Sequence, residues 1–123
     1  MTRAHVASAT IARLRSQLLD GPPADSAKAV VERLLAVQAQ DARGFRLAIR
    51  SRSTGLSAVD VDRALSQDRS LVVTWLNRGT LHLVRSEDYW WLHRLTAGRS
   101  PQGSERRLRQ EGVDARQAVR GVE

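Results

Sequence analysis

The chain has 123 residues, the length of one domain, and 41% of them are hydrophobic, which is enough for a modest core. There is no cysteine, which excludes a disulfide framework and a cysteine-based metal site and fits a reducing compartment. Residues 1–19 contain three arginines and no long apolar run, so we expect neither a signal peptide nor a membrane span. We therefore expect a cytoplasmic protein.

The charge balance is basic, with 20 Lys and Arg against 13 Asp and Glu and a net charge of +7. Such an excess favours an anionic partner, most often nucleic acid. Lys28 is the only lysine, and GC-rich coding is an alternative explanation for the dominance of arginine. Coding bias explains the ratio of the two residues but not the excess of positive charge.

The first part of the chain has helical periodicity. Apolar residues recur near a 3.6-residue period over 6–19, and Gly21 followed by two prolines ends this helix. Asp25 or Ser26 is suited to cap a second helix. The apolar stripe of that second helix falls at Ala27, Val30, Val31, Leu34 and Leu35. Gln38 continues the same spacing, so we expect it on the core side of this helix.

Two further short helices are expected next. Asp41 is placed to cap a helix in which Arg43, Arg46 and Arg50 share one face. Ser57 with Asp60 three residues later is typical of a capping box. The helix that begins there, over residues 57–66, buries Val61, Ala64 and Leu65 by its pattern.

From residue 71 the period changes to two, which predicts a β-hairpin over about 71–84. Its loop is Asn77–Arg78–Gly79, where Gly79 can adopt positive φ. Counting outward from Arg78 pairs Thr74 with His82 on one face. The same count places the apolar partners on the other face, toward the core: Val73, Trp75, Leu81 and Leu83.

Ser86 and the two acidic residues after it favour another helix, which carries Tyr89, Trp90, Leu92 and Leu95. Residues 97–123 are polar and rich in arginine, and Asp114 is suited to cap one more short helix. Helices followed by a two-stranded hairpin outline a winged helix-turn-helix, mainly α with a small antiparallel β-hairpin. We expect this module to span residues 1–96.

Three segments, "LLAVQAQDARG", "GLSAVDVDRAL" and "VVTWLNRGTLHLV", occur in this order with short spacings. Together they resemble the bacterial winged-helix DNA glycosylases of the AlkZ type, from about residue 11 to residue 95 and more weakly beyond. The resemblance implies tandem winged-helix units, double-stranded DNA as partner, and removal of alkylated or crosslinked bases without a metal or other cofactor. A glutamine–apolar–glutamine motif implicated in catalysis corresponds to Gln38 and Gln40.

Two features depart from the family pattern. Asn77 stands where an apolar residue is expected. The chain also ends at Glu123, so that residues 97–123 correspond only to the start of a second winged-helix unit, which we expect to be missing. The chain therefore resembles the N-terminal part of such a glycosylase. We expect apolar surface where the next unit docks, which would allow self-association.

The chemistry suits a positioned water. A glutamine amide is no general base, but two amides can orient a water and turn their carbonyl dipoles toward positive charge developing on the sugar. Taken alone, Gln38 is better explained as a structural residue and Gln40 as a solvated one, and only the family motif makes the pair a candidate site. An alkylated base is already a cationic leaving group, so a strong general acid is less needed.

Other residues are candidate DNA contacts, each with a structural alternative. Arg78 at the hairpin tip, His82 with Thr74, and the helix face of Arg43, Arg46 and Arg50 can reach DNA or be ordinary solvated groups. Arg69 is a weaker candidate. The three tryptophans read as core or interface residues. A repair glycosylase, a non-catalytic DNA-binding regulator and an inactive truncated product all remain open.

Overall fold

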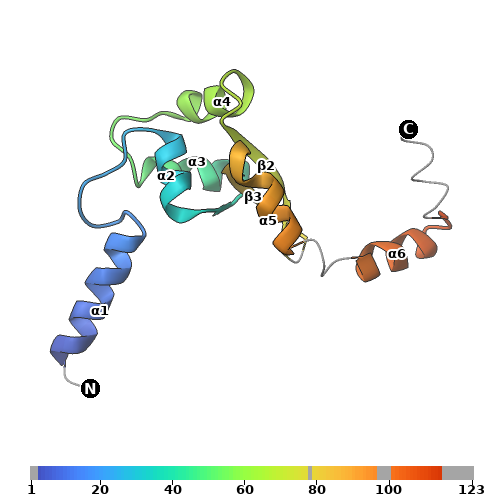
Figure 1. Ribbon diagram of the computed structural model, residues 1–123, viewed down its shortest axis with the longest axis horizontal. Coiled ribbons are helices and arrows are strands. Elements are labelled where there is room, and N and C mark those ends of the chain that lie inside the picture. The colour runs from blue at the N-terminus through green and yellow to red at the C-terminus, as the bar shows by residue number, and fades with distance from the viewer. Residues whose placement is uncertain (1–2, 78, 97–100, 115–123) are drawn as a thin grey trace.

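The computed structural model describes residues 3–77, 79–96 and 101–114. These residues form six α-helices, one 3-10 helix and three strands: α1 Arg3–Ser16, α2 Ala27–Leu34, β1 Val37–Gln38, α3 Ala42–Arg50, α4 Ala58–Ser66, β2 Leu71–Leu76, β3 Thr80–Arg85, η1 Ser86–Asp88, α5 Tyr89–Thr96 and α6 Pro101–Gln110. Elements α2 to α5 form the body of the molecule, and α1 and α6 project from it on opposite sides (Figure 1). The mainly helical winged-helix class expected from the sequence is confirmed.

Three helix starts lie where the sequence placed them. The Ser26 hydroxyl accepts a hydrogen bond from the Ala29 N–H at 3.2 Å, and the Asp41 carboxylate accepts one from the Arg43 N–H at 3.0 Å. At α4 the Asp60 carboxylate accepts from the Ser57 N–H at 2.8 Å, which is one half of a capping box. Each cap satisfies a backbone or hydroxyl group that would otherwise lack a partner at the helix end.

The hairpin has the register expected from its alternation. Thr74 pairs with His82 and Val73 with Leu83, and Gly79 adopts a φ of +71° in the loop. A third strand, β1, was not predicted: it pairs antiparallel with β3 and gives the strand order β1-β3-β2. The hairpin is therefore extended into a small sheet with β3 at its centre.

The sheet is covered on both faces. On one face Leu83 and Leu71 pack against a cluster from α2, α3 and α4 that includes the fully buried Val30 and Ile49. On the other face Leu76 and Val84 pack against Leu92 of α5. These two layers hold the hairpin, which would be only marginally stable alone.

The expectation that Trp75 lies in the core is wrong, because its side chain is 60% exposed. Its face is right, since Trp75 pairs with Leu81 beside Val73 and Leu83. The cluster of α2, α3 and α4 reaches Val73 on this face but not Trp75, whereas Leu76 on the other face is buried against α5. The alternation therefore predicts the face of Trp75 but not its burial. The apolar stripe of α1 is likewise exposed at Ile11 and Leu14.

The expected second helix is too long at its C-terminal end. It stops at Leu34, and Leu35 adopts a φ of +68°, a left-handed conformation unusual for a residue with a side chain. The chain then runs extended through β1, so Gln38 lies on a strand rather than on the helix stripe. In the tail, α6 is a helix that the sequence did not indicate, while the helix expected after Asp114 lies outside the described residues.

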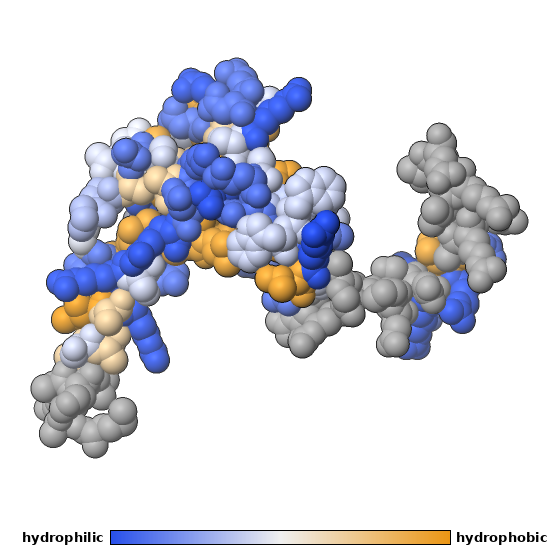
Figure 2. Space-filling model, in the orientation of Figure 1, coloured by the Kyte–Doolittle hydropathy of each residue, from blue (hydrophilic) through white to orange (hydrophobic). Residues whose placement is uncertain are grey.

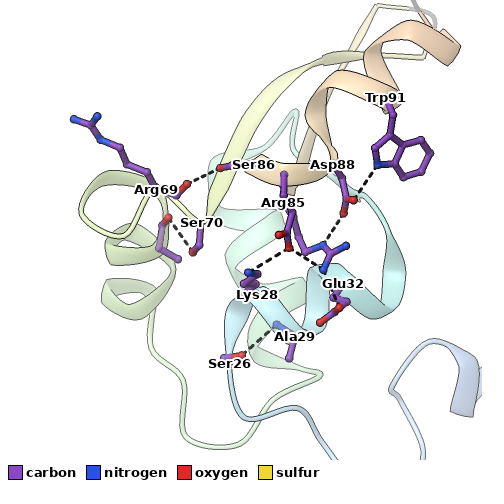
Figure 3. A network of polar contacts seen from close by, with 12 residues as sticks. Ser26, Lys28, Ala29, Glu32, Arg69, Ser70, Arg85, Ser86, Asp88 and Trp91 are labelled. Atoms are coloured by element: carbon purple, nitrogen blue, oxygen red, sulfur yellow. Dashed lines mark hydrogen bonds and ion pairs between the residues drawn. The ribbon is translucent and has the colours of Figure 1, made fainter.

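Arg85, the last residue of β3, joins the sheet to α2 and to the start of α5. Its guanidinium bonds Asp88 at 2.6 Å, Glu32 at 2.8 Å and Glu87 at 2.9 Å. The other oxygen of Asp88 accepts from the Trp91 indole N–H at 2.9 Å (Figure 3). Asp88 is buried, and this pairing supplies the partners that a buried carboxylate requires.

Replacing Asp88 tests this network. The hydrogen bond from Arg85 lowers the pKa of the Asp88 carboxyl below its ordinary value of 3.8. The ionised group therefore stabilises the fold fully above that ordinary value, and the contribution is lost as pH falls through the lower folded pKa. We expect Asp88→Asn to lower the free energy of unfolding by about 2 kcal/mol near neutral pH.

Urea unfolding of the wild type and of Asp88→Asn, followed from neutral pH into acid, measures this contribution. The difference between the two proteins should shrink as pH falls below the ordinary aspartate value. Asp68→Asn, at an exposed position, is the matched control. A difference that stays constant through the acid range would contradict the role given to the charge.

Candidate functional site

The two glutamines lie at the outer edge of the sheet. Gln38 ends β1 and pairs with His82, and Gln40 follows after one residue. Both glutamines are exposed, whereas Ala39 between them is buried in the core. The alternation turns the apolar residue inward and both amides outward, which is the pattern of extended chain at a sheet edge.

Gln40 has a specific structural partner. Its Oε1 accepts a hydrogen bond from the Leu81 N–H at 3.1 Å, and the Leu81 carbonyl accepts from the Ala39 N–H at 2.9 Å. The side chain thus takes the place of a backbone carbonyl where β1 ends. Because a backbone N–H must face the amide oxygen, this contact fixes the amide orientation and directs Nε2 away from Leu81.

Gln38, His82 and Thr74 lie in one row across the three strands, which we call the polar row. Gln38 and Thr74 are the register partners of His82 on its two sides, so the three side chains point to the same face. Gln38 is exposed, and His82 and Thr74 are half-buried. The sequence predicted the pairing of Thr74 with His82 but not that Gln38 joins it.

The expected basic face of α3 is divided. The Arg46 guanidinium bonds the Asp62 carboxylate through Nε at 3.0 Å and the Ala42 carbonyl at 2.6 Å, and it stacks on the ring of Phe45. Arg43 and Arg50 are exposed. Arg46 therefore ties α3 to α4, and Arg43 and Arg50 are the stronger candidates for phosphate contacts.

The remaining candidate arginines lie around the hairpin. Arg69 adopts a φ of +50°, its carbonyl accepts from the Ser86 hydroxyl at 2.6 Å, and its side chain points away from this contact (Figure 3). Its side chain is thus available to solvent. Arg78 lies outside the described residues, so its expected role at the hairpin tip stays a prediction.

The helix that would read DNA in a helix-turn-helix protein is α4, the second helix of the α3–α4 pair. It carries Asp60 and Asp62 against one arginine, Arg63, and Arg63 pairs with Asp60 at 3.4 Å. In Figure 2 the surface over α4 is hydrophilic. Its negative balance suits neither phosphate contact nor insertion into a groove.

Helix α5 leaves apolar side chains uncovered. Trp90 is 70% exposed and Leu95 is 74% exposed, while Trp91 is anchored by its bond to Asp88. Hydrophobic surface in Figure 2 gathers along the lower side of the body, near the ends of α2 and α5. The sequence left Trp90 and Trp91 as either core or interface residues. For Trp90 the core assignment is wrong, because its side chain is exposed.

Other kinds of site find no support in the described part of the chain. A depression of about 670 Å³ is lined by Ala7, Ser8, Ile11, Ala12 and Arg15, all from α1 and none a predicted site residue. Among the described residues, no three His, Asp or Glu side chains come together as a metal site would require. None of the described helices is long and apolar enough to span a membrane.

Comparison with known proteins shows the family to which this chain belongs. The family model "DNA glycosylase AlkZ-like" matches residues 31–123, and the chain belongs to that family. Among solved structures, the Streptomyces sahachiroi DNA glycosylase AlkZ is similar at a TM-score of 0.67 and 32% sequence identity. The match covers 88% of this chain and 29% of that one, so the chain spans about a third of its length. No curated protein matches.

The contact between Gln40 and Leu81 yields a prediction. Gln40→Leu removes the acceptor, so we expect the Leu81 amide hydrogen to exchange with solvent about fivefold faster, which corresponds to the loss of roughly 1 kcal/mol of hydrogen bonding. Gln40→Glu keeps an oxygen in place and should retain most of the protection. Amide hydrogen exchange followed by NMR measures both.

The Val84 amide is an internal reference, because Val84 pairs with Val72 on the opposite side of β3. Its exchange should be the same in all three proteins. Equal acceleration at Leu81 and Val84 would indicate general loosening of the sheet, and unchanged exchange at Leu81 in Gln40→Leu would refute the contact.

Proposed function

We propose that this protein is a DNA-repair glycosylase that hydrolyses the N-glycosidic bond of alkylated or crosslinked bases in double-stranded DNA. Gln38 and Gln40 orient the attacking water. The observation that carries the proposal is the outward projection of both amides from one sheet edge, with Ala39 buried between them. Membership of the AlkZ-like DNA glycosylase family supports the same conclusion.

The geometry suits this chemistry. The Leu81 N–H holds the carbonyl oxygen of Gln40, which fixes this amide before substrate arrives and leaves its Nε2 as a donor toward water or the lesion. Beside Gln40, the side-chain amide of Gln38 is exposed, and its carbonyl oxygen can accept a hydrogen bond from water. A positively charged alkylated base leaves with the electron pair of its bond to C1′, so the site needs to hold water and favour a cationic sugar.

DNA contact rests on exposed cations. The net charge of +7 attracts the phosphate backbone, and Arg43 and Arg50 offer exposed guanidinium groups on α3, the helix that begins shortly after Gln40. Arg69, Arg78, Thr74 and His82 complete the expected interface around the hairpin. A cytoplasmic location, where DNA of a bacterial cell is accessible, is part of the proposal.

A non-catalytic regulator is the main alternative, and α4 argues against it. A regulator of this fold reads bases with its second helix, which should carry cations or amides toward the major groove. The single cation of α4, Arg63, is paired with Asp60, and Asp62 is engaged by Arg46 of α3, so α4 offers no unpaired cation to the groove. The third reading, an inactive product, predicts DNA binding at most and no base release.

We also propose the division into a winged-helix module of residues 1–96 and a following segment, 97–123, that begins a second unit. The projection of α6 from the body supports this boundary (Figure 1). The exposed Trp90 and Leu95 form an apolar surface where a further unit or a second copy of the chain would dock. Self-association through this surface is the expected behaviour of the chain by itself.

Base release tests the glutamine mechanism. A duplex containing one N7-methylguanine is incubated with excess protein, and freed base is measured above the spontaneous rate. We expect the wild type to release base and Gln38→Ala/Gln40→Ala to be slower by about 10²-fold or more, because positioning and dipole stabilisation are both lost. Release that persists in the double variant would refute the mechanism, and none from the wild type would refute the activity.

The salt dependence of DNA binding tests the basic surface. We expect Arg43→Ala/Arg50→Ala to reduce the slope of log K against log salt by about two, one for each lost phosphate contact. The matched control is Arg13→Ala/Arg15→Ala, which removes the same charge from α1, away from the body. Equal slopes for the two variants would show that only net charge matters.

A further inference from the structure

His82 is placed beside the glutamines with one ring nitrogen already committed. Its Nδ1 lies 3.0 Å from the Thr80 carbonyl oxygen and 3.5 Å from the Thr80 hydroxyl. The ring is half-buried on the central strand, and its register partner on β1 is Gln38. Opposed residues on antiparallel strands have Cβ atoms about 5 Å apart, so the imidazole and the Gln38 amide are neighbours.

These contacts fix the proton of the neutral ring. A carbonyl oxygen only accepts, so the bond to Thr80 requires a hydrogen on Nδ1. The Thr80 hydroxyl donates its own hydrogen to the Asn77 carbonyl at 3.0 Å and thus faces Nδ1 as an acceptor too. Nε2 therefore carries the lone pair, and it has no hydrogen-bond partner among the described residues.

The proposed hydrolysis lacks a proton acceptor. When water attacks C1′, one of its protons must leave, and a neutral amide cannot take it. Histidine is the side chain whose neutral form accepts a proton near neutral pH. Gln38 and His82 together offer a carbonyl and a lone pair on one face, which are the two acceptors a nucleophilic water needs.

We propose that His82 is a catalytic residue that accepts the proton of the attacking water through Nε2, an inference that rests on the proposed glycosylase function. Gln38 holds the water, whose oxygen forms a bond to C1′ as one O–H proton passes to His82. The C1′–N bond breaks, and its electron pair leaves with the alkylated base, which becomes neutral. His82 then returns the proton to solvent.

Single-turnover base release measures this step apart from binding. With the N7-methylguanine duplex saturated by protein, we expect His82→Gln to be slower by about 10²-fold, the usual contribution of general-base catalysis. DNA affinity should stay within about twofold, since glutamine keeps a polar side chain of similar reach. His93→Gln, a histidine of α5 that stacks near Tyr89, is the matched control and should release base at the wild-type rate.

Imidazole rescue separates proton transfer from a structural role. We expect added imidazole to raise the rate of His82→Ala about tenfold and to leave the wild type and Gln38→Ala unchanged. Protection of the Leu81 amide from exchange shows whether each variant keeps the folded sheet edge. A folded His82→Ala that imidazole does not rescue would overturn the proton-acceptor role.

The remaining outcomes distinguish this inference from the proposed function. Base release by the wild type that Gln38→Ala abolishes and His82→Gln leaves unchanged would overturn the role of His82 alone. An effect of His82→Gln that disappears at saturating protein would limit His82 to the DNA contact proposed above and would overturn its role as proton acceptor. An inactive wild type overturns the proposed function and this inference with it.

Discussion

The site depends on the central position of β3. Leu81 offers both its N–H and its carbonyl to the segment that carries the glutamines, through Gln40 and Ala39, while its neighbours in β3 pair with β2. A strand's backbone groups alternate between its two sides, so only a central strand can hold the hairpin and the glutamine segment at once. Loss of β1 pairing would leave the glutamines on an unsupported loop.

Two further constraints keep β3 in place. Leu83 and Val84 are fully buried on opposite faces, which fixes the depth of the strand between the helical layer and α5. Arg85 fixes its end by bonding the carboxylate of Glu32 in α2 and those of Glu87 and Asp88 in η1. Arg85 of the charged network and His82 of the polar row both belong to β3, so any shift in the register of this strand would disrupt both.

The sequence predicted the parts of the fold that local patterns encode. The capping residues Ser26, Asp41 and Ser57 and the pairing of Thr74 with His82 follow from short-range chemistry and alternation. Strand β1 was missed because two residues have no period of their own, and the preceding apolar stripe suggested more helix. Only tertiary pairing with β3 and the left-handed Leu35 reveal its conformation.

The candidate site was predictable in its residues but not in its geometry. The family motif names Gln38 and Gln40 as candidates, and their role stays a prediction. The helical placement of Gln38 is wrong, and the ion pair that engages Arg46 depends on where α4 packs. His82 pairs with Gln38 although the two residues are 44 positions apart in the sequence, from 38 to 82. A local sequence pattern cannot predict a contact between residues so far apart.

The spacing of the two glutamines itself favours extended chain over helix. On a helix with 3.6 residues per turn, positions 38 and 40 would point about 200° apart and could not share one water molecule. In extended chain they point the same way, and the residue between them points into the core. A buried Ala39 between exposed amides satisfies this requirement. In this chain the glutamine–apolar–glutamine segment is thus a strand-edge pattern, in which the small apolar residue anchors the chain and both amides face outward.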